Sequence, residues 1–488
     1  MSPPAITVDE ENDFPTELKT NGIHFKFHST NGFAGRETIL PQISDECLDM
    51  LCVGFGPASL ATAVALHDTN YSKKPKYIFL EKEPKFSWHS GMQLPNAKMQ
   101  ISFLKDLATP RNPQSKFTFI NYLFNKKRLN QFINLSVILP SRLEFEDYLR
   151  WCADHFEVEG LVQYGMNVQS VCAGSKNSDG KVTSWNVISR KSNGEIVTKR
   201  ARNVVIAVGG KPMLPSELKG LQNVNHSSQY ISSIKKIQHR EVGRKPRFAV
   251  VGSGQSAAEI FNDLWTRFPE SEIKFIIKGA SLRPSDDSPF VNEIFDPDRV
   301  DVIYAQSPSQ RAASVNLDRG TNYGVVRLSL LEHLYEKLYM QRVVSPSPSE
   351  WNACIMNNRV IVSACETQDG SGILLKLCDS YNQQSGDYLE TLEVDYVYAA
   401  TGYQCNAHEE MLADVRSYLQ NNIAEKSNLW AVQRDYRIPF DPEKVVPDVG
   451  IWLQGCNEKT HGLSDTLLSI LAIRSGELVH SIFGTPEI

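Results

Sequence analysis

Two stretches of the chain share one pattern, in which a short apolar run meets a glycine-rich turn and then an alanine-containing segment. The first is LDMLCVGFGPASLATAVALHD, which begins near Cys47, and the second is RFAVVGSGQSAAEIFNDL, at residues 247–264. A short apolar run bounded by glycines is typical of a buried strand, and the segment after it is long enough for a helix. A further apolar run follows each, at residues 77–80 and in EIKFIIKGASLRP. The pattern predicts an α/β fold with two Rossmann-like dinucleotide-binding units.

Other apolar runs complete these units. RNVVIAVGG and LEVDYVYAATGYQ each indicate a buried strand that ends in a sharp turn, and GIWLQGCNEKTHGLSDTLLSILAIRSGELVHSIF indicates a final strand, loop and helix. From residue 82 to about 140 the chain is aromatic and rich in turn residues, which predicts a segment that covers a ligand. The serine-rich piece at residues 306–314 is expected to be a surface loop or insertion.

Composition narrows the functions open to this fold. Hydrophobic residues make up 41% and charged residues 22% of the chain, as in ordinary globular proteins. A net charge of -5 without a basic stripe argues against nucleic acid as a partner. No apolar run is long enough for a membrane span, and the acidic, proline-rich N-terminus is unlike a signal peptide, so we expect a cytoplasmic protein. The nine scattered cysteines contain no C-x-x-C pair, which argues against disulfides, zinc and dithiol redox chemistry, and most are expected to be buried.

The first glycine motif is typical of an FAD site. Residues 54–59 (GFGPAS) join a predicted strand to a predicted helix, where glycines allow a tight turn and a pyrophosphate approaches the helix N-terminus. Glu81 lies 27 residues past Gly54, where a carboxylate can accept a hydrogen bond from a ribose hydroxyl. The alternative is a glycine turn in an ordinary α/β sheet.

The second motif differs in the charge at the ribose position. Residues 252–257 read GSGQSA, and the residue 26 positions past Gly252 is Lys278. A cation there, helped by Arg283, attracts a 2′-phosphate, so we assign NADPH to this site. The alternative is a solvated lysine at a strand end. A chain that holds both cofactors can reduce its flavin, and without a C-x-x-C pair dioxygen is the leading electron acceptor, through a C4a-hydroperoxyflavin.

Several motifs together resemble one family. They are GFGPASLA, KMQISFLKDLATPRNP, RLEFEDYLRWC, VVGSGQSAAEIFNDL, RPSDDSPFVNEIFDP, TNYGVVR, AATGY and LQGCNEKTHGLSDTLLS. The chain is similar to the N-hydroxylating flavin monooxygenases, above all to the fungal L-ornithine N5-monooxygenases of siderophore biosynthesis. The resemblance implies hydroxylation of the side-chain amine of L-ornithine with NADPH and O2, the first step of hydroxamate siderophore biosynthesis, by a homotetramer.

The resemblance also implies which residues contact each ligand, with no side chain acting as a catalyst. The FAD contacts, glycine turn included, are Gly54, Gly56, Pro57, Ser59, Glu81, Lys82, Phe86, Trp88, His89, Gln100, Val168, Thr466, Leu467 and Leu468. The NADPH contacts are Gly252, Ser253, Gly254, Gln255, Ser256, Lys278 and Asn322. The substrate contacts are Lys105, Asn292, Glu293, Ile294, Phe295 and Ser469.

Two of these assignments also have a physical rationale. The carboxylate of an amino acid needs a cation, which Lys105 can supply, although a surface lysine is the alternative. Asn292 offers an amide that both donates and accepts, and a turn or helix-cap role is the alternative. At position 278 the close relatives have an arginine. Lys278 keeps the positive charge, but it lacks the guanidinium group that can donate two parallel hydrogen bonds to a phosphate. We interpret His461 as a loop residue with structural hydrogen bonds and give it no catalytic role.

These assignments divide the chain. We expect a flexible arm at residues 1–44, an FAD-binding domain at 45–215 and 396–488, an NADPH-binding domain at 216–298 and 335–395, and a substrate-binding insertion at 299–334. Two alternatives stay open. One is a related flavin monooxygenase that acts on lysine, a diamine or a sulfur nucleophile, and the other is a non-catalytic redox flavoprotein.

Overall fold

The larger of two sheets brings together strands from both ends of the chain. The computed structural model describes residues 42–240, 243–381, 390–420 and 430–484. Seven strands form this sheet, in the order β3-β2-β1-β6-β5-β4, with β17 also paired to β6. Because β6 is 11 residues long, its first half pairs with β5 and its second half with β17. The strands are β1 (Gln42–Val53), β2 (Tyr77–Leu80), β3 (Val162–Gln163), β4 (Met166–Ala173), β5 (Trp185–Lys191), β6 (Ile196–Ile206) and β17 (Gly450–Leu453).

The second sheet is wholly parallel. Its strand order is β11-β10-β9-β15-β8, and every pairing in it is parallel. Its strands are β8 (Val224–His226), β9 (Phe248–Val251), β10 (Ile273–Ile276), β11 (Ala353–Met356) and β15 (Tyr396–Ala399). A three-stranded antiparallel sheet comprises β12 (Arg359–Glu366), β13 (Ile373–Asp379) and β14 (Glu390–Val394), and the chain's two crossings between the large sheets pair as β7 (Lys211–Pro212) and β16 (Tyr403–Gln404).

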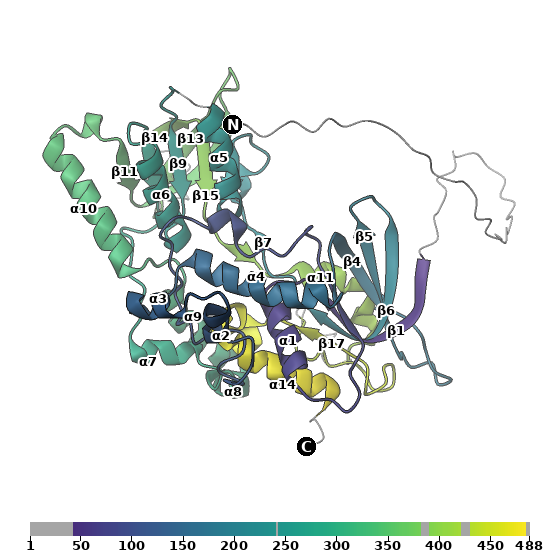
Figure 1. The fold of residues 1–488 in the computed structure, drawn as a ribbon. Helices are drawn as coiled ribbons and strands as arrows, with labels where there is room; N and C mark the ends of the chain where they lie inside the picture. The colour runs from purple at the N-terminus through teal and green to yellow at the C-terminus, as the bar shows by residue number, and fades with distance from the viewer. Residues whose placement is uncertain (1–41, 241–242, 382–389, 421–429, 485–488) are drawn as a thin grey trace, which may run out of the picture. The chain divides into compact units, whose positions relative to one another are not determined.

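Helices cover both large sheets (Figure 1). Helix α1 (Pro57–Asp68) packs on α4 (Arg142–Val158) and α14 (Leu471–Phe483), and the second sheet carries α5 (Tyr230–Arg240), α6 (Gln255–Arg267) and α10 (Leu328–Val344). The remaining α-helices are α2 (Phe119–Asn125), α3 (Leu129–Leu135), α7 (Pro289–Asn292), α8 (Arg299–Ala305), α9 (Pro308–Asn322), α11 (Ala407–Met411) and α13 (Glu458–His461). The 3-10 turns are η1 (Ser90–Met92), η2 (Ser216–Leu218), η3 (Ser227–Gln229), η4 (Glu293–Phe295), η5 (Pro348–Glu350), η7 (Ala413–Tyr418), η8 (Leu463–Thr466) and η9 (Leu468–Ile470).

The predicted α/β class is confirmed, because both glycine motifs join a parallel strand to a helix. Each following apolar run pairs with the motif's own strand, and the C-terminal strand β17 returns to the first sheet. The boundaries of the three predicted domains stay a prediction. Among the helices of the described residues, none is both long and apolar enough to cross a membrane.

Three local predictions were wrong. Residues 42–44 of the predicted arm belong to strand β1, which pairs with β6 from Gln42 on; residues 1–41 of that arm lie outside the described part of the chain. The predicted loop at 306–314 is mostly the start of α9, since Ser307 caps that helix and Pro308 occupies its first turn. Three cysteines are buried, four are half-buried and two are exposed, so most are not buried, although all nine are free thiols.

Candidate active site

The first glycine turn is held by backbone contacts that a side chain would block. Gly54 has a φ of 91°, and a Cβ there would lie 2.5 Å from the carbonyl oxygen of Ala207, just past β6. Gly56 begins α1 without a side-chain cap, and within the described chain no heavy atom lies within 4 Å of where its Cβ would stand. The N-terminus of α1 therefore fits a pyrophosphate, because its N–H groups face open space and its first turn has no acidic residue.

The Glu81 side chain lies against this turn. Its Oε2 accepts a hydrogen bond from the Phe55 amide at 2.7 Å and its Oε1 accepts one from the Glu83 amide at 2.9 Å. The carboxylate therefore stands beside the glycines, and a carboxylate has lone pairs left for a ribose hydroxyl. Ser59 faces inward, since it is buried and its hydroxyl donates to the Gly54 carbonyl at 2.7 Å. Its side chain supports the turn instead of pointing at a ligand.

The second glycine turn repeats this construction. Gly252 has a φ of 132°, and a Cβ there would lie 2.5 Å from the carbonyl oxygen of Ala400, just past β15. Gly254 begins α6 with no side-chain cap and no acidic residue in the first turn. In both turns, the first glycine lies against the backbone just past a neighbouring parallel strand, and a helix without a side-chain cap follows. The N-terminus of α6 therefore also fits a pyrophosphate.

The predicted NADPH contacts come from the turn before α6, the segment after β10 and the end of α9. Lys278 is exposed and lies two residues past the end of β10, and Arg283 is also exposed. Asn322 ends α9, and two residues later the Cα of Gly324 stands 3.7 Å from the ideal Cβ position of Gly254. The end of α9 therefore lies against the second glycine turn, and Lys278 follows the strand that pairs with β9, the strand before that turn.

Both ends of the Gln255 side-chain amide already have a protein partner. Its Oε1 accepts from the Arg327 amide at 2.9 Å, and its Nε2 donates to Glu259 at 2.9 Å. Glu259 is buried and forms a bidentate ion pair with Arg142 of α4, at 2.9 and 3.0 Å. Gln255 therefore belongs to a network that ties the second nucleotide unit to the helices of the first.

The remaining predicted FAD contacts divide between buried and exposed positions. Phe86 and Trp88 are buried in the core that contains Phe55, and the Phe55 and Phe86 ring centroids are 6.0 Å apart. Val168 is buried in β4, while Thr466, Leu467 and Leu468 are half-buried in the C-terminal loop. His89, Gln100 and Lys82 are exposed; the His89 ring lies 6.4 Å from that of Tyr403, and Lys82 is 3.8 Å from Glu83.

Tyr323 joins the two nucleotide regions. Its hydroxyl donates to Glu458 Oε2 at 2.8 Å and lies 3.4 Å from the Thr466 hydroxyl, while its chain neighbour Gly324 lies against the second glycine turn. Tyr323, the residue after the predicted NADPH contact Asn322, therefore contacts Thr466, the first of the predicted C-terminal FAD contacts.

The predicted substrate residues come from three distant segments that converge. Ser469 is buried and its hydroxyl donates to the Phe295 carbonyl at 3.1 Å, which joins the C-terminal loop to η4. Lys105 Nζ lies 3.2 Å from Oδ1 of Asp296, the residue after Phe295. Asn292 is exposed, and its amide donates to the Asp287 carbonyl at 3.0 Å, so its side chain serves its own turn. Glu293 is exposed on the same segment.

Lys105 is positioned by the residue that follows it. The Asp106 carboxylate is buried and accepts hydrogen bonds from the amides of Ala108, Thr109 and Phe119 at 2.6–2.9 Å, and from the Thr109 hydroxyl at 2.8 Å. Burial raises the pKa of Asp106, and these hydrogen bonds oppose that shift. They fix the turn that carries Lys105.

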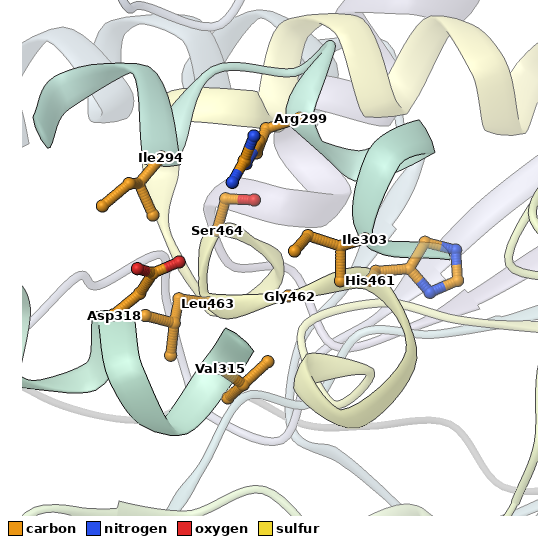
Figure 2. Close-up of a pocket in the computed structure, with 9 residues that line it drawn as sticks. All are labelled: Ile294, Arg299, Ile303, Val315, Asp318, His461, Gly462, Leu463 and Ser464. Carbon is orange, nitrogen blue, oxygen red and sulfur yellow. The ribbon is translucent and has the colours of Figure 1, made fainter. Parts of the chain in front are cut away.

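A small cavity lies beside the substrate segment (Figure 2). Its volume is about 10 Å³, the least space that holds one water molecule. In Figure 2 the Arg299 guanidinium extends toward the Ser464 hydroxyl, while Asp318 approaches from the other side, below Ile294. Ile294 thus faces a packed region between α8, α9 and the C-terminal loop, and amino-acid-sized ligands do not fit in this cavity.

The C-terminal loop is fixed by buried polar groups. Arg474 and Asp465 form an ion pair at 3.1 Å with 2% and 0% of their side chains exposed, and Asp465 Oδ2 also accepts from the Asn457 amide at 2.6 Å. His461 stacks on Tyr436 with centroids 4.2 Å apart and bonds to the Arg434 carbonyl at 3.0 Å. Burial lowers the pKa of His461 to about 4, so the ring is neutral at pH 7. These contacts agree with the structural role expected for His461.

The family model of L-lysine 6-monooxygenase/L-ornithine 5-monooxygenase matches residues 46–405. The chain belongs to this family. The resemblance predicted from the motifs is thereby confirmed, as is the assignment to the monooxygenases.

Individual members of the family match over most of the chain. The L-ornithine N(5)-monooxygenase of Cochliobolus heterostrophus is 48% identical over 468 residues, which cover 91% of this chain and 88% of its own. That of Aspergillus oryzae is 47% identical over 454 residues, covering 90% and 89%. The ornithine N-hydroxylase of Kutzneria sp. 744, solved with reduced FAD, NADP+ and L-ornithine, is 34% identical with a TM-score of 0.79, covering 90% and 99%.

Three features of the site were not predicted from the sequence: Asp296, Tyr323 and the Asp465–Arg474 ion pair. Asp296 was passed over because its partner Lys105 is 191 residues away, which leaves no local pattern. Tyr323 was missed for the same reason, since it contacts Glu458 and Thr466 across more than 130 residues. The Asp465–Arg474 pair had a usable signal, because two opposite charges lie in an otherwise apolar C-terminal segment, where isolated charges are costly.

Proposed function

We propose that the chain hydroxylates the N5 side-chain amine of L-ornithine with FAD, NADPH and O2, the first step of hydroxamate siderophore biosynthesis. The observation that carries the proposal is the convergence of Lys105, Phe295 and Ser469 on one place, next to a C-terminal loop that also reaches Tyr323 at the second glycine turn. Relatives with 45–48% identity carry the name of this activity. The reaction balances as amine, O2, NADPH and a proton giving hydroxylamine, water and NADP+.

The proposed roles of the residues follow from their places. The N-termini of α1 and α6 would hold the two pyrophosphates, and Lys278 would hold the 2′-phosphate that distinguishes NADPH from NADH. A reduced flavin supplies the chemistry that activates dioxygen for transfer to an amine.

On the substrate side, Lys105 would bind the α-carboxylate and fix the depth to which the side chain extends. An amine one methylene further out, as in lysine, would then miss the reacting position, which accounts for selection by chain length. The other task of the protein is to exclude water, because a wet site releases hydrogen peroxide in place of product. The amine must be neutral to act as a nucleophile, so activity is expected to rise with pH.

We also propose a homotetramer. Helix α10 buries only Leu334 among the described residues, and on one face, at a spacing of four residues, it exposes Tyr335, Tyr339 and Val343 by 75%, 58% and 56%. A contiguous apolar helix face of this kind supports a subunit contact. The cytoplasmic location stays a prediction from the N-terminal sequence, as do the domain boundaries.

A panel of amines tests the proposed substrate. L-ornithine, L-lysine and putrescine are each incubated with the FAD-loaded protein, NADPH and air, and hydroxylamine and peroxide are measured together. With ornithine we expect about one hydroxylamine molecule for each NADPH oxidised, and with lysine or putrescine we expect no hydroxylamine. Peroxide only with ornithine, together with hydroxylamine from lysine or putrescine, would assign the chain to another substrate. Bound FAD that NADPH does not bleach would favour a non-catalytic flavoprotein.

A further inference from the structure

A groove runs along the outer face of helix α6. Its walls come from residues 94–98 of the covering segment, from α6 and from residues 327–333 at the start of α10, and its volume is about 590 Å³. Small-molecule sites in proteins usually measure roughly 300–1,000 Å³. Of the predicted cofactor and substrate contacts, only Gln255 lines the groove, so its space is not accounted for by the proposed reaction.

The two carboxylates that line the groove already have cationic partners. Glu259 is buried and forms the bidentate ion pair with Arg142. Asp263 accepts hydrogen bonds from Arg267 Nε at 2.5 Å and from the Tyr230 hydroxyl at 2.6 Å. Neither carboxylate therefore gives the groove an uncompensated negative charge.

Two cations of the groove lack such a partner. Among the ion pairs of the described residues, none includes Lys98 or Arg327. Lys98 is exposed, and the carboxylate that it attracts, on Glu144, already pairs with Arg128 at 3.8 Å. Arg327 is half-buried, and its Nη1 donates to the Met99 carbonyl at 3.3 Å, which leaves other guanidinium donors for a ligand. The groove thus has a positive balance of charge.

The other walls suit the carbon skeleton of an organic molecule. Leu94 and Leu330 provide apolar surface, and the exposed side chains of Thr266, Ser329 and His333 add groups that can donate hydrogen bonds. A single inorganic ion would leave most of this volume empty. We propose that the groove is an effector site for a small organic anion with at least two carboxylate or phosphate groups, which Lys98 and Arg327 bind.

Arg327 connects this groove to both predicted cofactor sites. Its guanidinium bonds the carbonyl of Met99, the residue before the predicted FAD contact Gln100, and its backbone amide donates to the predicted NADPH contact Gln255 at 2.9 Å. An anion that draws the guanidinium into the groove weakens the bond to Met99. Since that bond ties the flavin segment to the second nucleotide unit, a bound anion should slow flavin reduction by NADPH.

Calorimetry on the FAD-loaded protein tests the site with three probes. Citrate offers carboxylates alone, 3-phosphoglycerate offers a phosphate and a carboxylate, and acetate offers a single charge. NADP+ is present throughout, so that the anions do not bind to Lys278. The variants are Lys98→Ala and Arg327→Met, and Lys74→Ala, which removes an exposed lysine between α1 and β2, is the matched control.

We expect citrate or 3-phosphoglycerate to bind with a Kd below about 1 mM, and acetate to bind more weakly because it leaves one cation unused. The tighter of the two identifies the preferred anionic group. Lys98→Ala and Arg327→Met should each weaken that binding about tenfold, the usual effect of losing a hydrogen bond between charged groups, and Lys74→Ala should not change it. Arg327→Lys, which keeps the charge, should bind more tightly than Arg327→Met. A melting temperature and flavin content equal to the wild type show that each variant is folded.

Stopped-flow reduction of the flavin by NADPH tests the effector role. A saturating concentration of the tighter anion should slow reduction about twofold or more in the wild type, in line with the worth of one hydrogen bond, and should have no effect at that concentration in Lys98→Ala. An equal rate with and without the anion would overturn the effector role.

Three further results would overturn the inference. The first is a Kd above about 1 mM for both citrate and 3-phosphoglycerate. The second is equal binding by the wild type and Lys98→Ala, which would place the anion elsewhere on the protein. The third is a smaller particle for Lys98→Ala than for the wild type in light scattering, because the groove would then be filled by a second copy of the chain.

Discussion

Replacing Arg474 with methionine removes one half of the buried ion pair that fixes the C-terminal loop. Asp465 is 0% exposed, so its carboxylate would stay in the interior with one backbone hydrogen bond, from Asn457. Its backbone carbonyl would also lose the bond from Arg474. Removing one partner of a buried pair costs about 3–5 kcal/mol, because the other charge is left uncompensated.

This loss should be visible both in stability and in flavin retention. The predicted FAD-binding domain has about 260 residues, and a domain near this size loses roughly 2–4 °C in melting temperature per kcal/mol, so we expect a fall of about 10 °C for Arg474→Met. Residues 466–468 directly follow Asp465 and are the predicted C-terminal FAD contacts, so the variant should also release FAD more readily. Thermal unfolding with excess FAD, followed by flavin fluorescence after gel filtration, measures both effects.

Two further variants separate the buried charge from a general loss of packing. Asp465→Asn combined with Arg474→Met removes both charges and should recover most of the stability. Arg434→Met breaks ion pairs with Asp301 and Glu477, which are 70% and 34% exposed, and should cost no more than about 1 kcal/mol. A melting temperature of Arg474→Met within about 2 °C of the wild type would refute the reasoning.

Three other results are expected. Lys278→Ala should lower the ratio of kcat/KM for NADPH over NADH roughly tenfold, since one charged contact to a 2′-phosphate is lost; an unchanged ratio would remove Lys278 from the site. Asp106→Asn should raise the KM for ornithine while flavin reduction by NADPH stays near normal, because the turn that carries Lys105 loses acceptors; equal damage to both steps would place that turn elsewhere. Stability should fall on acidification, because burial lowers the pKa of His461 from 6.5 to about 4 and the unfolded chain then binds more protons between those values. Between pH 7 and pH 5 the free energy of unfolding should fall by about 2 kcal/mol through protonation of His461 in the unfolded chain. The melting temperature of His461→Phe should therefore fall less than that of the wild type over that range. An equal fall would contradict the assignment.

The elements that a local pattern encodes could be predicted from the sequence. The two glycine turns are an example, because the spacing of glycines between an apolar run and a helix expresses a backbone requirement that only glycine meets at Gly54 and Gly252. The same holds for the strands that follow each turn. The start of α9 was also encoded locally, since Ser307 and Gln310 form a capping box and Pro308 occupies the first turn, but the serine-rich composition was interpreted as a loop.

Contacts between distant segments could not be predicted in the same way. The pairing of Lys105 with Asp296 spans 191 residues, and neither neighbourhood carries a mark of the other. The direction of a side chain was equally hidden: Ser59 points inward and Asn292 serves its own turn, although both lie in motifs that were expected to contact ligands. The direction of a polar side chain depends on which backbone groups the fold brings near it, and the local sequence does not give that information.

The most direct measurement of the central claim is turnover of L-ornithine by the FAD-loaded protein with NADPH under heavy-isotope dioxygen, with the product identified by mass spectrometry. We expect ornithine that has gained one heavy oxygen atom on its side-chain nitrogen, with one NADPH oxidised for each product molecule. Unlabelled product, oxygen at the α-nitrogen, or NADPH oxidation that yields only heavy hydrogen peroxide would contradict the account.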